Sequence, residues 1–325
     1  MIITRTPLRI SLGGGGTDLP AYYRARGGFL VAAAITKHIY VAVHENFEPA
    51  VFLKYSAIER VAEAAQVKHP LIREALLHSG LSTGIEVSSM ADIPAGTGLG
   101  SSGSFAVGLV KALLAYEHRF ASSAEIAEIA CHLEIDRLDE PVGKQDQYIA
   151  ALGGVTAIEF HTDDTVSARA VAMPSDTRQL LQENLLLFYT GVRRSASDEL
   201  RALSEGMELS EAEVTKNLDE VKRSGYRSVD ALEHGDLAVF AELLNEQWEL
   251  KYSRSPSSLH RTVDDWIRLG IKAGALGGKL VGAGGGGFLL FYAERKTELR
   301  AVMSELGLTE VTFGIDYQGT TVIVQ

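Results

Sequence analysis

The sequence predicts an α+β protein built from two domains. Its 325 residues, 46% of them hydrophobic, are enough for two hydrophobic cores. The first half mixes β-rich stretches with helical patterns, whereas the second half opens on a strand, continues through acidic amphipathic helices and closes on a further helix and strand. A polar stretch from His161 to Arg178 separates the two halves. We therefore expect a boundary near residue 175, with domains at 1–175 and 176–325.

The first half contains strand and helix signals in a regular order. The segment IEVSSM is β-rich and predicts a strand, and the apolar residues that recur at helical intervals from Phe105 onward predict a helix behind it. Ser122 and Glu125 form a capping-box pattern, which predicts a helix over 124–138. The predicted strands of this half are Leu8–Leu12, Phe29–Val43 and Ile85–Met90.

The second half begins with NLLLFYTGV, residues 184–192, which predicts a strand. Between residues 196 and 250 the pattern is that of acidic amphipathic helices. A glycine cluster at 282–287 follows a helical pattern and precedes the apolar segment FLLFY. Its simplest interpretation is a tight turn from helix to strand. It also contains GxGxxG letters, but its elements have the reverse of the dinucleotide-binding order.

One segment, PAGTGLGSSGSF at 94–105, carries the strongest functional signal. Glycines let the backbone approach a ligand closely, and a helix beginning just downstream directs free N–H groups and positive dipole toward that ligand. The order of strand, glycine loop and helix therefore suits phosphate binding. The expected nucleotide-binding residues are Pro94, Gly96, Gly98, Leu99, Gly100, Ser101, Ser102, Gly103 and Ser104.

Two other classes of glycine loop fit this segment less well. A Walker loop needs a lysine in register, and neither this segment nor the 282–287 cluster supplies one. The dinucleotide fingerprint is present, but residues 92–95 separate the strand from the glycines, and the acidic residues about twenty positions on fall in helical stretches. A dinucleotide oxidoreductase remains an alternative, which would bind NAD and show no phosphoryl transfer.

Hydroxyl and carboxyl groups near this loop suggest phosphoryl transfer. Ser101 and Ser102 are either ordinary helix caps or, beside a phosphate, suitable ligands for Mg²⁺, which takes few protein ligands. Transfer also needs a group that positions or deprotonates the attacking hydroxyl. Glu134 and Asp146 are candidates, because the break EPVG reverses the chain between them. From the residues alone, a solvated helix acid and an acid at a helix N-terminus remain the simpler explanations.

Composition argues against several classes of protein. The formal net charge of −11 disfavours nucleic acid or an anionic membrane as partner. No apolar run approaches the length of a membrane span, and the first ten residues lack a signal-peptide core, so we expect a cytoplasmic protein. Cys131 is the only cysteine; it lies at core spacing, where a structural thiol is expected. The nine histidines form no zinc-binding pattern.

A third glycine cluster gives these signals a family context. The segment PLRISLGGGGTDLPAYY, residues 7–23, contains Arg9 and ends its four glycines with Thr17 and Asp18. Here the sequence resembles the sugar kinases of the GHMP family, the small-molecule kinases named for galactose, homoserine, mevalonate and phosphomevalonate. PAGTGLGSSGS is similar to the family's second motif, and KLVGAGGGGF, residues 279–288, to its third. The three motifs occur in the family's order, so the resemblance covers most of the chain.

The resemblance implies a fold, cofactors and residue roles. The fold would join an N-terminal domain like ribosomal protein S5 to a ferredoxin-like C-terminal domain, and the enzyme would use ATP and Mg²⁺. Ser102 and Glu134 would hold Mg²⁺, Asp146 would orient or deprotonate the acceptor hydroxyl, and Arg9 would lie near the transferring phosphate or this base. The expected substrate-binding residues are Gly15, Gly16, Thr17, Asp18, Gly284, Gly285 and Gly286.

Within the family, the sequence is most similar to the heptose 7-phosphate kinases of bacterial surface-sugar synthesis. These phosphorylate the anomeric C1 hydroxyl of D-glycero-D-manno-heptose 7-phosphate, giving the 1,7-bisphosphate. Gly15 and Gly16 replace the bulkier pair of the galactokinase form, which leaves space beside Asp18 for a longer sugar. A 7-phosphate would need a basic partner, for which Arg193 and Arg194 are the candidates, although arginines there are also ordinary surface residues.

Two further interpretations stay open. A fucose-type or other sugar 1-kinase is the alternative within the family, because only a few side chains distinguish the stereochemistry of hydroxyls. A catalytically silent relative would bind sugar and nucleotide as a sensor, and metal-dependent turnover of ATP would distinguish it from an enzyme. The expected partners are a sugar phosphate and MgATP, without nucleic acid or membrane, and a homodimer is one possible assembly.

Overall fold

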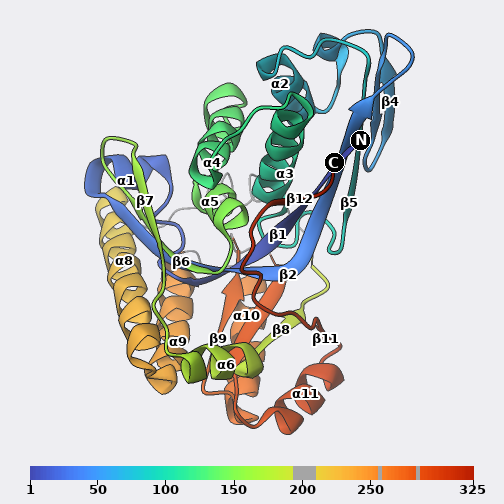
Figure 1. The fold of residues 1–325 in the computed structure, drawn as a ribbon. Helices are drawn as coiled ribbons and strands as arrows, with labels where there is room; N and C mark the ends of the chain where they lie inside the picture. Colours follow the sequence, from blue (N-terminus) through green and yellow to red (C-terminus); the bar gives the residue numbers. More distant parts are fainter. Residues whose placement is uncertain (193–209, 255–257, 283–285) are drawn as a thin grey trace.

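The computed structural model describes residues 1–192, 210–254, 258–282 and 286–325. These ranges form an eight-stranded and a four-stranded β-sheet with helices packed against both (Figure 1). Helices α2 to α5 gather over one side of the larger sheet, and α8 and α9 pack side by side (Figure 1). The predicted α+β class is confirmed.

The first sheet is organised around two long strands, β1 and β2. The first half of β2 pairs with β6 and its second half with β5, so the order is β12–β1–β2–β5–β3–β4 with β6 and β7 attached beside β2. The three strands predicted for this half are present with longer bounds. The strands are β1 (Ile2–Gly13), β2 (Gly28–Glu45), β3 (Val51–Lys54), β4 (Ile58–Val61), β5 (Ile85–Ala91), β6 (Val155–Phe160), β7 (Val166–Ala170) and β12 (Thr321–Val324).

The helices over the first sheet place the glycine loop and both candidate carboxylates. The capping box of Ser122 and Glu125 is formed as predicted, and the helix it starts continues into a π-helical turn, His132–Arg137. Cys131 is buried and free, and burial raises the pKa of its thiol, as suits a structural residue. These helices are α1 (Pro20–Arg26), α2 (Pro70–His78), α3 (Ser101–Tyr116), α4 (Ser123–Cys131) and α5 (Gln145–Leu152).

The second sheet separates two hydrophobic cores. Side chains alternate along its strands, so Leu187 and Leu290 join the core of the first sheet, whereas Leu186 and Leu289 join a smaller core under α10 and α11. Its order is β11–β8–β10–β9, antiparallel throughout. Its strands and the accompanying helices are α6 (Ser175–Asn184), β8 (Leu185–Tyr189), α8 (Glu211–His234), α9 (Leu237–Arg254), α10 (Ser258–Lys272), β9 (Gly277–Val281), β10 (Phe288–Tyr292), α11 (Lys296–Glu305) and β11 (Thr309–Glu310). No helix within the described ranges is both long and apolar enough to span a bilayer.

Two local expectations for the second half were wrong. Asn184 ends α6 rather than beginning the strand, which runs only to Tyr189. The glycine cluster follows β9, not a helix, and so connects two antiparallel strands. Strand β9 has no clear sequence signal, because it begins with two glycines. A Cβ on Gly277 would lie 1.8 Å from the carbonyl oxygen of Ala241, so close packing of α9 requires glycine there.

The C-terminal segment returns to the first sheet. Ile315 forms a bridge with Ile35, and β12 then pairs antiparallel with β1. On the way, the His38 Nε2 and Asp316 Oδ2 atoms lie 2.8 Å apart in a buried hydrogen bond. The domain boundary near residue 175 stays a prediction; α6 begins at that residue, and the segment from Ile315 onward lies with the first sheet.

Candidate active site

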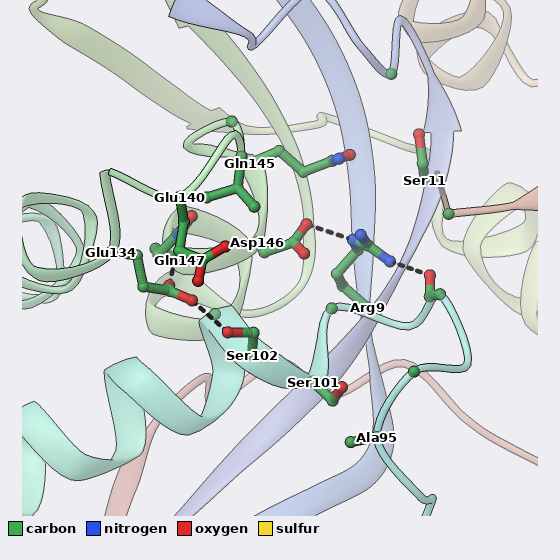
Figure 2. Close-up of a pocket in the computed structure, with 18 of the residues that line it drawn as sticks. Arg9, Ser11, Ala95, Ser101, Ser102, Glu134, Glu140, Gln145, Asp146 and Gln147 are labelled. Atoms are coloured by element: carbon green, nitrogen blue, oxygen red, sulfur yellow. Dashed lines mark hydrogen bonds and ion pairs between the residues drawn. The ribbon is translucent and has the colours of Figure 1, made fainter. Parts of the chain in front are cut away.

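A cavity of about 1160 Å³ lies where the loops of the first sheet meet α8, α9 and β9. All three glycine motifs line it, as Gly16, Gly98 and Gly286 illustrate. Figure 2 shows its polar end, where side chains from β1, α3, α5 and the π-helical turn converge. Motifs that are distant in the sequence therefore form one site.

The second and third glycine motifs pack directly against each other. Gly98 has a φ of +81°, and a Cβ on Gly282 would lie 2.6 Å from the Gly98 Cα atom. A Cβ on Gly287 would likewise lie 2.0 Å from the carbonyl oxygen of Thr97. Only glycine permits these approaches. The third motif thus packs against the backbone of the second and supports its conformation.

Helix α3 begins at Ser101 without a side-chain cap. Its N-cap position is Gly100, in the left-handed conformation, so none of the described side chains satisfies the first N–H groups. The hydroxyl of Ser104 donates instead to the carbonyl of Pro7, and that of Ser102 donates to Glu134. Capping therefore does not explain these serines, and the helix end can accept an anion.

Asp146 lies against this helix end and is held by Arg9. The Arg9 Nε atom donates to Asp146 Oδ1 over 2.7 Å, and its Nη1 donates to the carbonyl of Gly98 (Figure 2). A Cβ on Gly103 would lie 2.6 Å from the Asp146 Cβ atom, so glycine is needed for this approach. The arginine therefore fixes the carboxylate relative to the phosphate loop, as its expected role requires.

Glu134 is a buried carboxylate paired with Ser102. Its side chain is only 2% exposed and accepts hydrogen bonds from the Ser102 hydroxyl and from Gln147 Nε2, the latter at 2.7 Å (Figure 2). Burial raises the pKa of Glu134 to about 7, although these two hydrogen bonds oppose the shift. The π-helical turn directs it inward, a backbone irregularity that is frequent at functional sites.

Ser102 and Glu134 fit a hard divalent cation. A hydroxyl oxygen and a carboxylate oxygen are suitable Mg²⁺ ligands, and a buried acid without a cationic partner is costly to ionise until a positive charge arrives. Among the residues that the structure describes, no three acidic, histidine or cysteine side chains are grouped so that they could hold a metal ion. Two protein ligands nevertheless suffice where phosphates and water complete the shell.

Asp18 lies on the other side of Asp146, beneath the first glycine motif. Its carboxylate accepts backbone hydrogen bonds from Gly16 and from Gln145, at 3.1 and 3.2 Å. Burial, followed by the nearby charge of Asp146, raises its pKa. Thr17, expected to bind substrate, instead faces inward: it is fully buried and its hydroxyl lies 2.9 Å from the carbonyls of Gly14 and Phe29. Its role is to hold the loop that presents Asp18.

Replacing Gly143 with alanine should raise the KM for the acceptor about tenfold. A Cβ there would lie 1.9 Å from Asp18 Oδ2, so the Asp18 carboxylate must move, and overpacking of this kind costs roughly 1–3 kcal/mol. Steady-state kinetics with each substrate would measure the change. Gly314→Ala is the matched control, because its nearest contacts lie at 3.6 Å or more. If the KM for the acceptor equals that of the control, Asp18 does not bind the acceptor.

The remaining expected residues divide into three groups. Gly96, Gly100 and Ser101 line the cavity, as do Gly15 and Gly16. Three others, Leu99, Ser104 and Pro94, do not line it. Leu99 is a core residue and Ser104 is fully buried. The carbonyl of Pro94 accepts a hydrogen bond from the Thr97 hydroxyl. The third group lies outside the described residues: Arg193, Arg194, Gly284 and Gly285.

Several lining residues were not predicted from the sequence. The Ser11 hydroxyl and the Gln145 Oε1 atom are buried, line the cavity and have no hydrogen-bond partner among the described residues. At the opposite, apolar end, the ring of His69 lies 4.8 Å from that of Tyr55 and 5.6 Å from that of Phe105, measured between centroids. Burial lowers the pKa of His69, so its ring is neutral and suits contact with a planar base.

A helix end behind a glycine loop, a serine–glutamate pair that suits a cation and an aspartate held by an arginine are together typical of a phosphotransferase. Sequence profiles agree with this class. The profile described as GHMP kinases N terminal domain matches residues 55–154, and the one described as GHMP kinases C terminal matches residues 228–309, together more than half of the chain. The chain belongs to the GHMP kinases and is an ATP-dependent kinase.

Several known proteins that resemble the chain over most of its length are named as kinases. It is 26% identical to a D-glycero-alpha-D-manno-heptose 7-phosphate kinase of Campylobacter jejuni, with 95% of each chain covered. It is 28% identical to an L-fucokinase/L-fucose-1-P guanylyltransferase of Bacteroides fragilis, over 93% of this chain and 36% of that protein. A crystal structure of a D-glycero-D-manno-heptose 1-phosphate kinase from Bacteroides thetaiotaomicron shares the fold, with a TM-score of 0.81, 24% identity and coverage of 100% and 99%. The predicted GHMP kinase fold is confirmed.

Proposed function

We propose that this kinase phosphorylates the anomeric C1 hydroxyl of D-glycero-D-manno-heptose 7-phosphate. The product is the 1,7-bisphosphate, for nucleotide-activated heptose and surface polysaccharide. The observation that carries the proposal is the polar end of the cavity, which Asp146 and Asp18 line together with the oxygens of Ser11 and Gln145, which have no hydrogen-bond partner in the described part of the chain. This arrangement suits an acceptor with many hydroxyl groups. The Campylobacter relative, similar over 95% of the chain, supports the choice of heptose 7-phosphate.

Asp146 is the proposed acid–base residue. Its carboxylate is one-quarter exposed toward the cavity and sits at the start of α3, where the γ-phosphate of ATP would lie. It takes the proton from the C1 hydroxyl or orients that hydroxyl for direct in-line attack, and no covalent phosphoenzyme is expected. Arg9, which is 5% exposed, keeps the carboxylate oriented through its hydrogen bond.

Ser102 and Glu134 would hold Mg²⁺ in this proposal. The bound ion would supply positive charge to the phosphate oxygens of ATP. Gln147 keeps the Glu134 carboxylate oriented through its hydrogen bond, and the free N–H groups of α3 contribute the remaining positive potential. Since the reaction consumes ATP, we expect the protein to act in the cytoplasm.

A fucose-type sugar 1-kinase is the second candidate function. The Bacteroides fragilis relative has a slightly higher identity than the heptose kinase, at 28%, but it matches this chain with only 36% of its length. Both candidates require the same catalytic residues, because each places an anomeric hydroxyl at Asp146. They differ in whether the acceptor carries a phosphate at the end farthest from its C1 hydroxyl.

The proposed function is tested by release of ADP from MgATP in the presence of different acceptors. A suitable panel contains heptose 7-phosphate, mannose, fucose and galactose. Selective turnover of heptose 7-phosphate is the expected result. Preference for an unphosphorylated sugar would replace the proposed acceptor but keep the mechanism. If none of the acceptors releases ADP, the sensor interpretation replaces catalysis.

A further inference from the structure

One face of α9 carries a row of polar side chains into the cavity. Gln247, Lys251 and Arg254 are spaced by four and three residues, which places them on the same side of the helix, and all three line the cavity. The Gln247 amide is fixed by three contacts: its nitrogen donates to the carbonyl of Leu12 and to Ser228, and its oxygen accepts from Lys279. The row is therefore anchored to both β1 and β9.

Lys279 adds a third basic side chain behind this row. It lies on β9, is 6% exposed and donates from Nζ to the Gln247 side-chain oxygen over 2.7 Å. Burial lowers the pKa of Lys279 to about 7, and the positive charges of Lys251 and Arg9 lower it further in the same direction. The electrostatic potential at this wall of the cavity is therefore positive.

The described contacts of Arg254 and Lys279 are to neutral oxygens. The Arg254 Nη1 atom donates to the side-chain oxygen of Asn217 over 2.9 Å, and Lys251 Nζ donates to the carbonyl of Gly282. Within the described residues, neither Arg254 nor Lys279 forms an ion pair with a carboxylate. Burial lowers the pKa of Arg254 to about 10, and its guanidinium has five N–H donors. Burying several like charges is costly unless an anion joins them, so this wall is suited to an anionic ligand.

The position of Arg254 assigns that anion to the acceptor. Its Nη2 atom lies 3.8 Å from where a Cβ on Gly16 would stand, next to the loop that presents Asp18. Asp146, another carboxylate that lines the cavity, is already paired with Arg9. The Mg²⁺-binding pair of Ser102 and Glu134 belongs to α3 and the π-helical turn instead.

We propose that Arg254 and Lys251, supported by Lys279, bind a phosphate ester carried by the acceptor at its non-reacting end. This inference rests on the proposed function, in which the acceptor is a sugar phosphate. A guanidinium held by Asn217 can present two parallel N–H groups to phosphate oxygens, and Lys251 supplies a second point charge one helical turn away. It assigns the phosphate to α9, whereas the sequence-based candidates Arg193 and Arg194 lie outside the described residues.

Arg254→Met and Lys251→Met test this assignment. For each protein, kcat/KM is measured with heptose 7-phosphate and with unphosphorylated heptose, and KM is measured for ATP. Each substitution should lower kcat/KM for heptose 7-phosphate by roughly 10- to 100-fold, the value of charge-assisted hydrogen bonds, and should affect unphosphorylated heptose far less. The preference for the phosphate ester therefore falls. Arg254→Lys should restore part of it, since it retains the charge.

Lys216→Met is the matched control, because Lys216 is an exposed cation on α8 that does not line the cavity. Calorimetric titration with heptose 7-phosphate and with ATP checks binding without turnover and confirms that each variant is folded. If the variants keep the wild-type preference, or raise only the KM for ATP, the assignment is overturned while the proposed function stands. If the wild-type enzyme neither binds nor phosphorylates heptose 7-phosphate, the proposed function fails and this inference fails with it.

Discussion

Asp146→Asn lowers kcat by roughly 100- to 10,000-fold and leaves ATP affinity nearly unchanged, if Asp146 acts on the acceptor hydroxyl as proposed. Asparagine keeps the shape of the side chain and an oxygen that can accept from Arg9 Nε, now 2.7 Å from Asp146 Oδ1. It removes the charge and the capacity to accept a proton. Single-turnover kinetics with saturating MgATP separates this loss from an effect on binding.

The control for this substitution is Asp136→Asn, which neutralises an exposed acid on the same side of the molecule. Asp136 pairs with His132 on the surface and does not line the cavity. Its kcat should match the wild type. An unaltered kcat in Asp146→Asn would refute the role of this residue, and the acceptor would then be activated by orientation through other groups.

Glu134→Gln should abolish most of the Mg²⁺-dependent activity, by roughly 100-fold or more, and yet stabilise the metal-free protein at pH 8. The folded protein holds a proton on Glu134 up to a pKa of about 7, above the ordinary value of 4.5. Between pH 4.5 and about pH 7, the folded state binds more protons than the unfolded state. The stability of the metal-free protein therefore falls as the pH rises through this range. Glutamine is neutral at every pH and avoids this cost, which is on the order of 3 kcal/mol.

The stabilisation is measured as the difference in Tm between variant and wild type in a chelator, at pH 8 and at pH 4. The variant should be more stable at pH 8, and the difference should nearly vanish at pH 4. Glutamine can accept from Gln147 and donate to Ser102, so packing is preserved. Glu242→Gln on the exposed face of α9 should show neither effect. A variant that is less stable at pH 8 would mean that Glu134 is a structural acid rather than one reserved for a cation.

The sequence predicted the parts of the site that have local signals. A glycine loop, a capping box and the acids near them follow from spacing along one stretch of chain, and Glu134, Asp146 and Ser102 do converge. The inward direction of Thr17 was not predictable, because it depends on the carbonyl of Phe29 across the sheet. Local sequence does not distinguish a loop hydroxyl that binds a ligand from one that holds the loop.

The basic side chains of α9 that line the cavity were not predicted from the sequence, for a related reason. Lys251 and Arg254 directly follow the predicted acidic, amphipathic stretch of residues 196–250, and only the packing of α9 on β9 shows which face of the helix is enclosed. That contact depends on Gly277, whose strand gave no sequence signal. Arg193 and Arg194 lie outside the described residues, so their proposed contact with the phosphate stays a prediction.

The alternation of side chains along β8 and β10 also determines how cooperatively the protein unfolds. Since Leu187 and Leu290 face one core while Leu186 and Leu289 face the other, neither half keeps a complete interior when the other is removed. Heating should therefore produce a single cooperative transition rather than two separate ones, despite the two-domain architecture. Fragments divided near residue 175 would expose apolar strand faces, and they would become soluble only on recombining with each other.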